Sequence, residues 1–128
     1  MLGDADVAPS IAVSDLAAAK EFYGNVLGLK MDNESPGGVL YKSGGCWVFV
    51  YPSPSAGTNK ATYAGWVTKD VEGVAEGLKA KGVSLLQYDN IPGVTRKGDI
   101  HYMDGEDTMA IWFEDPTGNI LSVSNQMG

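Results

Sequence analysis

His101 is the only histidine in this 128-residue chain, so it is the only side chain expected to titrate near neutral pH without perturbation. One interpretation makes it a general base or ligand-contacting group, with Tyr102 beside it. The interpretation we favour, because no partner motif surrounds it, is an exposed loop histidine between Asp99 and Asp104. A metal bound by His101, these two carboxylates and Glu106 can be imagined. However, one loop supplying every donor is a poor match to metal sites held on strands.

Cys46 and the pair Glu114–Asp115 are the other groups with chemical potential. The single thiol has no neighbouring base in the sequence, and an unactivated thiol is mostly protonated at neutral pH, so we expect it to be inert. One cysteine also excludes an internal disulfide and a cysteine cluster for zinc. Asp115 opens the segment Asp-Pro-Thr-Gly-Asn, where an aspartate more often holds a turn through its own backbone. We therefore assign this pair a structural role.

The composition is that of an acidic globular domain. The chain has 9 Lys and Arg against 16 Asp and Glu, a formal net charge of −7, with 44% hydrophobic and 20% charged residues. Phosphate neutralisation supplies most of the affinity for nucleic acid, so we expect no nucleic-acid partner; the sign favours neutral or cationic partners. The apolar runs are short and the first residues do not form a secretion signal, so we expect a cytoplasmic protein without membrane contact.

The elements that must position these groups follow an internal repeat. Asp15 and Asp70 each follow a short strand pattern and can cap a helix, and apolar residues then recur at helical spacing. Gly28 and Gly82 come where each helix should end. Each half therefore predicts a strand followed by a helix.

Each half then continues as a hairpin. Segments 39–42 and 47–51 flank a Ser-Gly-Gly turn, and segments 109–113 and 120–123 flank the Asp-Pro-Thr-Gly-Asn turn. With the strand after each helix, every half reads as strand, helix and three strands. Segment 91–107 has no clear period and is longer than most connections, which is typical of a functional or mobile loop.

The fold predicted from this repeat is α+β, with two βαβββ modules at about residues 8–51 and 61–125. A Pro- and Ser-rich linker, 52–60, joins them within a single domain that spans 1–128. One helix covers only one face of its sheet, so two modules side by side would form a curved, partly open, eight-stranded mixed sheet with the helices outside. The concave face would form a cup, which is a natural small-molecule site.

Three aromatic residues, Trp47, Phe49 and Tyr51, alternate along one strand with Val48 and Val50 between them. Alternate residues of a strand share a face, so the rings and the valines lie on opposite sides. Either set could face the helices. Small β-branched residues suit a close-packed helix–sheet layer, so we favour the arrangement with the valines under the helices and the rings in the cup.

The repeat extends this inner face into the second half. Tyr63 and Ser122 would lie on it, and Trp112 joins them because Ile111 and Phe113 make the better core pair. The candidate ligand-binding residues are Trp47, Phe49, Tyr51, Tyr63, Trp112 and Ser122. Such a pocket is aromatic, with hydroxyl groups and few charges, and is suited to stacking on a flat or cationic organic ligand.

The chain resembles the vicinal oxygen chelate superfamily, which includes glyoxalases, extradiol dioxygenases and bleomycin-resistance proteins. The resemblance covers residues 8–125, and its motifs are Val13-Ser14-Asp15-Leu16, Phe22-Tyr23, Leu27-Gly28-Leu29 and Phe113-Glu114-Asp115-Pro116-Thr117-Gly118-Asn119-Ile120-Leu121. It implies a metal site, in which His or Glu side chains on the inner strands of both halves hold a divalent ion for two neighbouring substrate oxygens.

The positions that the resemblance assigns to metal ligands carry Ala8, Tyr63 and Ser122, and the fourth falls in strand 47–51, which has no His or carboxylate. Alanine offers no donor, and tyrosine and serine hydroxyls are poor ligands for divalent ions near neutral pH. We therefore expect no metal cofactor.

These observations leave three functional hypotheses. The first is a metal-free protein that holds a small organic ligand in its aromatic cup, as the bleomycin-resistance branch does. The alternative is a divalent-metal-dependent lyase, isomerase or dioxygenase with relocated ligands, for which His101 and Tyr63 would be the catalytic candidates. The third is an interaction module with a vestigial cup. Because members of the family commonly pair, we also expect a homodimer.

Overall fold

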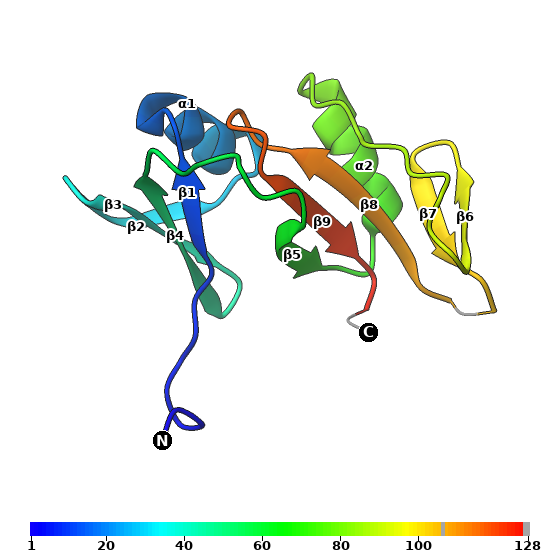
Figure 1. Ribbon diagram of the computed structural model, residues 1–128, viewed down its shortest axis with the longest axis horizontal. Coiled ribbons are helices and arrows are strands. Elements are labelled where there is room, and N and C mark those ends of the chain that lie inside the picture. The colour runs from blue at the N-terminus through cyan, green and yellow to red at the C-terminus, as the bar shows by residue number, and fades with distance from the viewer. Residues whose placement is uncertain (106, 127–128) are drawn as a thin grey trace. The chain divides into compact units, whose positions relative to one another are not determined.

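The computed structural model describes residues 1–105 and 107–126, and the chain divides into two compact units, Met1–Asn59 and Lys60–Gly128. Each unit contains one sheet and one helical segment (Figure 1). This confirms the prediction of an α+β fold built from paired βαβββ modules. Within the described residues, no helix is both long and apolar enough to cross a membrane.

The first unit has a four-stranded sheet in the order β1-β4-β3-β2. Strand β1 runs parallel to β4, whereas β3 pairs with β4 and with β2 in antiparallel fashion. Its elements are β1 (Ser10–Val13), α1 (Leu16–Lys20), the π-helical segment η1 (Glu21–Val26), β2 (Lys30–Ser35), β3 (Gly38–Ser43) and β4 (Cys46–Pro52).

The second unit repeats this order and adds a strand. Its sheet runs β5-β9-β8-β7-β6, with β5 parallel to β9 and the other pairs antiparallel. Its elements are β5 (Thr62–Val67), α2 (Val71–Ala80), β6 (Val94–Lys97), β7 (Ile100–Met103), β8 (Met109–Glu114) and β9 (Ile120–Ser124).

Both helices begin and end where the sequence predicts. The Oδ1 atom of Asp15 accepts a hydrogen bond from Ala18 N–H at 3.1 Å, and that of Asp70 accepts one from Gly73 N–H at 2.9 Å. These bonds satisfy backbone donors that have no partner within the first turn of a helix. Gly28 and Gly82 follow the helices with φ of 76° and 84°, the left-handed region in which a side chain would be strained.

Segment 91–107 departs from its sequence pattern, because strands β6 and β7 form a hairpin within it. No strand follows directly after α2, where we expected one, and two form in this segment instead, so the described residues form nine strands and not eight. The two strands have only four residues each, and β6 is an edge strand with one neighbour. Strands of four residues are too short to show a clear alternation of apolar and polar residues in the sequence.

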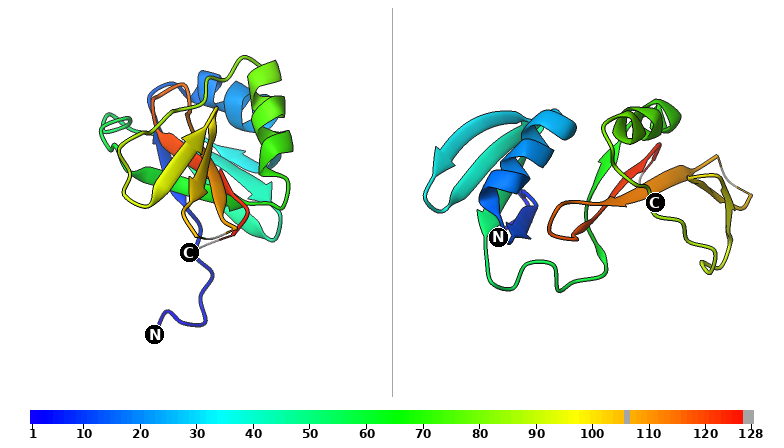
Figure 2. Two further views of the ribbon diagram at one scale, coloured as in Figure 1. Left: turned by 90° about the vertical axis from the view of Figure 1, so that its right-hand side faces the viewer. Right: turned by 90° about the horizontal axis from the view of Figure 1, so that it is seen from above.

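Each helical segment packs against one face of its own sheet (Figure 2). In β4, Val48 and Val50 are buried and the three aromatic rings between and beside them are only partly buried. In β8, Ile111 and Phe113 are buried and Trp112 is partly exposed. The valines and the Ile111–Phe113 pair thus form the core, as the alternation predicts, and the aromatic rings lie on the opposite faces.

Candidate functional site

The open face of the first sheet, opposite its helix, carries the rings of Trp47, Phe49 and Tyr51, and we call it the ring face. The rings of Phe49 and Tyr51 stack with centroids 5.7 Å apart and planes 9° from parallel. A Cβ at Gly38 would come within 2.9 Å of Phe49 Cζ. The absence of a side chain there lets the Phe49 ring lie close against the start of β3. The result is a flat, partly exposed aromatic surface.

Trp47 extends this surface and is already engaged by a cation. Lys42 lies directly opposite Trp47 in the β3–β4 register, and its Nζ is 5.5 Å from the Trp47 ring centroid. This distance is within the range of a cation–π interaction. The indole Nε1 of Trp47 is buried and has no hydrogen-bond partner among the described residues.

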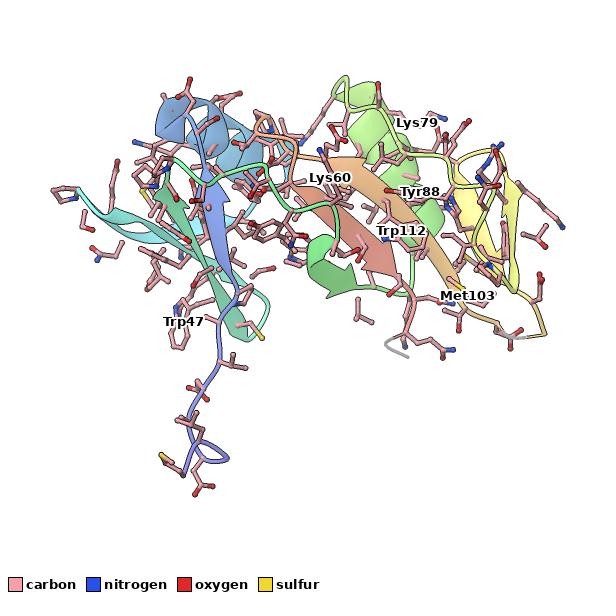
Figure 3. All side chains as sticks on the ribbon, in the orientation of Figure 1. Trp47, Lys60, Lys79, Tyr88, Met103 and Trp112 are labelled. Carbon is pink, nitrogen blue, oxygen red and sulfur yellow. The ribbon has the colours of Figure 1, made fainter. Side chains whose placement is uncertain are left out.

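In the second unit, Trp112 is held by three neighbours, of which Tyr88 is seen beside it in Figure 3. The rings of His101 and Tyr88 meet it edge-to-face, at centroid distances of 4.8 Å and 5.5 Å. The indole Nε1–H of Trp112 donates to Thr62 Oγ1 at 3.2 Å. These contacts come from β7, which neighbours β8, from β5, which lies beyond β9 on the other side, and from the segment after α2. The Trp112 ring is therefore fixed in position by the surrounding fold.

Ser122 lies on the same face as Trp112, because the two residues are opposite each other in the β8–β9 register. Ser122 is also opposite Gly65, where an added Cβ would stand 2.6 Å from Ser122 Oγ. Tyr63 lies at the register shift of the β5–β9 pair, between Thr62 and Ala64, and has no paired residue of its own in that register.

Two residues that contact Trp112, namely Thr62 and Tyr88, were not predicted from the sequence. Thr62 bonds Trp112 because the register shift brings it opposite Ile120, and a bulge of this kind has no mark in a single sequence. Tyr88 follows α2 in a segment without regular secondary structure, and its contact with His101 joins positions 13 residues apart. Neither contact could be found from spacing alone.

His101 is fully buried on β7, so the expectation of an exposed loop histidine is wrong. Tyr88 N–H donates to His101 Nε2 at 2.9 Å, so the neutral imidazole carries its hydrogen on Nδ1. Nδ1 is buried too and has no hydrogen bond of normal geometry within the described part of the chain. Burial lowers the pKa of His101, and the backbone groups of Ala110 and Asp99 oppose this only in part. The imidazole is therefore neutral at pH 7.

The imagined metal site in the 99–106 segment does not form. Asp99 accepts hydrogen bonds from Lys79 and Gln87, and the first of these is the main cause of the lowered pKa of its carboxyl group. Asp104 accepts a hydrogen bond from Thr95 Oγ1 at 2.7 Å. Glu106 lies outside the described residues. With these carboxylates bonded elsewhere, they do not converge on His101.

The residues at the expected ligand positions do not fit a divalent ion either. Ala8 has no donor atom, and Tyr63 and Ser122 offer only hydroxyl groups. Over residues 1–105 and 107–126, no three His, Cys, Asp or Glu side chains gather in a way that could hold a metal. No chemical step can therefore be assigned to a metal held by these side chains.

The carboxylate of Asp115 holds the β8–β9 turn, as expected. Its Oδ1 accepts hydrogen bonds from the backbone N–H groups of Thr117 and Asn119 at 2.9 and 2.8 Å, and its Oδ2 accepts one from Asn119 Nδ2 at 2.9 Å. This carboxylate is buried and fully committed to the turn. Cys46 is free and exposed at the start of β4.

Comparison with known proteins gives a consistent family match. The model of the Glyoxalase/Bleomycin resistance protein/Dioxygenase superfamily matches residues 7–123. No curated protein sequence matches the chain significantly.

Solved structures resemble the chain over nearly its full length. TnmS3, an antibiotic binding protein from a Streptomyces species, is 21% identical with a TM-score of 0.69, and the match covers 96% of this chain and 97% of that one. The lactoylglutathione lyase of Agrobacterium tumefaciens is 19% identical with a TM-score of 0.68, covering 94% and 92%. A glyoxalase/bleomycin resistance protein/dioxygenase from Alicyclobacillus acidocaldarius is 19% identical with a TM-score of 0.69, covering 97% and 93%. At these identities the likeness concerns the fold.

Proposed function

Because the chain belongs to the Glyoxalase/Bleomycin resistance protein/Dioxygenase superfamily, we propose that it is a metal-free member that binds a small organic ligand. The observation that carries this proposal is the pairing of an exposed aromatic surface with ligand positions that lack metal donors. Aromatic rings that are not used in the core are available to stack on a flat ligand.

Each unit offers a candidate ligand surface of its own, and the two surfaces differ. In the first unit, the stacked rings of Phe49 and Tyr51 bind the planar part of the ligand, and Trp47 contacts its edge. In the second unit, Trp112, Ser122 and Tyr63 are the proposed contacts. Trp112 is the most rigid of these, because its indole N–H is hydrogen-bonded to Thr62 and its ring packs edge-to-face against His101 and Tyr88. A ring that is already ordered loses little conformational entropy on binding, which favours affinity.

One structural relative supports a binding role, since TnmS3 is named as an antibiotic binding protein. Another, named as a lactoylglutathione lyase, supports the alternative of a metal-dependent enzyme. The buried state of His101 disfavours that alternative, because a general base must reach the substrate directly or through one water. The metal-free binding protein is therefore the function that the site supports best.

Elemental analysis tests the metal-free part of the proposal. Purified protein is incubated in turn with Mn²⁺, Fe²⁺, Ni²⁺ and Zn²⁺, desalted and measured for bound metal. We expect far less than one equivalent of each. One retained equivalent of any of these metals would overturn the metal-free proposal, and metal-dependent turnover of a lyase or dioxygenase substrate would then favour the enzyme.

Native mass spectrometry of protein from a cell lysate tests ligand binding. We expect a retained small molecule that dissociates on activation. Replacing Phe49 with Ala should weaken its binding about tenfold or more, as expected for the loss of a stacked ring. The matched control, Val67→Ala, removes an exposed side chain outside the ring face and should leave retention unchanged. Equal retention by both variants would argue against the ring face.

We further propose that two copies of the chain pair as a homodimer. Strands β2 and β6 each lie at an edge of their sheet, and an edge strand presents unpaired backbone groups to a partner. Light scattering at micromolar concentration should give twice the monomer mass of 13.5 kDa. The monomer mass under these conditions would contradict the dimer.

A further inference from the structure

The charges on the ring face differ from those of the chain as a whole. Lys42 lies opposite Trp47 in the β3–β4 register, and Lys30 lies opposite Lys42 in the β2–β3 register. Directly opposed residues of neighbouring antiparallel strands share a face, so the two ammonium groups and the indole form one row across three strands. Both lysines are exposed, and neither forms a salt bridge within the described chain.

The next row along the same face is uncharged. Phe49 lies opposite Ser10 on β1 and opposite Leu40 on β3, and Leu40 lies opposite Asn33 on β2. The stacked Phe49–Tyr51 pair thus stands beside a row that carries two positive charges. An aromatic surface next to an unpaired cationic edge is the arrangement that complements a planar anion.

Neither carboxylate of β2 forms a salt bridge with these two lysines. Glu34 lies opposite the buried Val39, and its Oε1 is 2.6 Å from Lys20 Nζ on α1, which places it on the helix side. Asp32 falls in the register irregularity between Met31 and Asn33, outside the regular pairs. The formal charge of −7 is therefore a poor guide to this surface, and the local charge decides which ligand is favoured.

We propose that the ligand bound by the ring face is a planar aromatic anion, with its ring stacked on Phe49 and Tyr51 and its anionic group beside Lys42 and Lys30. This proposal rests on the small-molecule-binding function given above and narrows its ligand class. A cationic ligand is disfavoured here, because Lys42 already occupies the vicinity of the Trp47 ring and two like charges would repel it. Each ammonium group contributes about fivefold in affinity, from the attraction of two unit charges about 4 Å apart in water.

Three probes that share one ring system test the charge preference in the full chain. They are 2-naphthoate, 2-naphthylmethanol and 2-naphthylmethylammonium, titrated separately while backbone amide shifts are followed by NMR. We expect 2-naphthoate to bind about 25-fold tighter than the alcohol, because two ammonium groups contribute about fivefold each, and to be favoured by still more over the ammonium probe. The largest shifts should fall on β3 and β4, and the preference should shrink with added salt.

Matched lysine variants test the residues. Lys42→Gln and Lys30→Gln should each weaken 2-naphthoate binding about threefold to fivefold and leave the neutral probe unchanged. Lys69→Gln, at an exposed position outside the ring face, should change neither. Lys42→Glu should remove the preference between the charged probes, because the new carboxylate offsets the charge of Lys30. All three positions are solvent-facing, so thermal melts serve to verify that the four variants fold normally.

The possible outcomes separate the two proposals. If the alcohol or the ammonium probe binds as tightly as 2-naphthoate on β4, the anion preference is overturned and ligand binding by the ring face stands. If none of the probes shifts β4 at millimolar concentration, both proposals fail. If β4 signals instead change on dilution without any probe and Lys42→Glu changes the mass in solution, a second copy covers this face and the anion proposal is overturned.

Discussion

The two units repeat one backbone pattern but use their open faces differently. Strands β4 and β9 correspond, because each pairs in parallel with the first strand of its unit. On its open face β4 carries three aromatic rings, whereas the matching positions of β9 carry Ile120, Ser122 and Ser124. The aromatic ring of the second unit lies one strand further on, at Trp112 of β8.

The faces that contact the helices have changed much less. Val48 and Val50 of β4 match Leu121 and Val123 of β9, and all four are buried. Even the ion pairs correspond. Lys20 at the end of α1 reaches Glu34 of β2, and Lys79 near the end of α2 reaches Asp99, next to β7. Packing against a helix restricts which side chains fit, whereas the open face is free to change and to acquire function.

The additional strand β6 gives the second unit a feature that the first lacks. His101 of β7 lies opposite Arg96 of β6, and it is closed off from solvent. With Tyr88, it braces Trp112 on one side. The first unit presents three partly exposed rings beside lysines, while the second presents one ring fixed by its neighbours beside hydroxyl groups. We therefore expect the charge of the ligand to affect its binding mainly at the first unit.

The largest expected effect tests the contrast between core and open faces in both units. Leu121→Ala should lower the free energy of unfolding by about 2–5 kcal/mol, and Val50→Ala by about 2–3 kcal/mol, because each leaves a cavity beneath a helix. Ser122→Ala, one residue away on the open face, should change it by less than about 0.5 kcal/mol. Urea denaturation measures all three. A large loss for Ser122→Ala would break the distinction between the faces.

An intermediate effect is expected at His101. His101→Ala should lower the free energy of unfolding by about 1–3 kcal/mol, because the backbone N–H of Tyr88 loses its acceptor in a partly buried site. His101→Gln offers a side-chain oxygen near the position of Nε2 and should recover part of this loss. The comparison is made by urea denaturation at pH 8, where the imidazole of the wild type is neutral, so that protonation of His101 does not contribute to the difference.

The pH dependence of the wild type should follow from the same site. Because burial lowers the pKa of His101 from 6.5, the unfolded chain takes up the proton first as the pH falls. Stability is complete above about pH 6.5 and declines as the pH drops from there through the lower folded pKa. Arg96 and Asp89 face the imidazole with opposite charges. The hydrogen bond from Arg96 lowers the pKa of the Asp89 carboxyl group, so this group takes up a proton only in stronger acid. His101→Gln should remove the decline in stability below pH 6.5. If the decline is unchanged in that variant, it does not arise from His101.

The smallest effect concerns the helix caps, where the two units should behave alike. Asp15→Ala and Asp70→Ala should each lower the free energy of unfolding by about 1 kcal/mol, because each removes a side-chain acceptor from a helix N-terminus. Asn at either position keeps an acceptor and serves as the control. Thermal melts of the four variants measure the effect. A clear difference between the two caps would show that the repeat is not equivalent at this level.

Much of the fold and part of the candidate site could be predicted from local patterns. The helix caps, the glycines that end the helices and both predicted hairpins are set by residues close together in the chain. Alternation placed Val48 and Val50 in the core and Trp112 opposite Ile111 and Phe113. These signals survive in a single sequence because a strand or a helix turn fixes side-chain direction by spacing alone.

The tertiary structure decided what spacing cannot encode. The register shift between Thr62 and Ala64 brought Thr62 opposite Ile120, where it accepts a hydrogen bond from Trp112. The β6–β7 hairpin holds the buried His101, and cross-strand pairing set Lys30, Lys42 and Trp47 in one row. Each of these results depends on which strands pair and in which register. Pairing is a property of distant segments, whose mutual alignment is determined by the packing of the whole sheet.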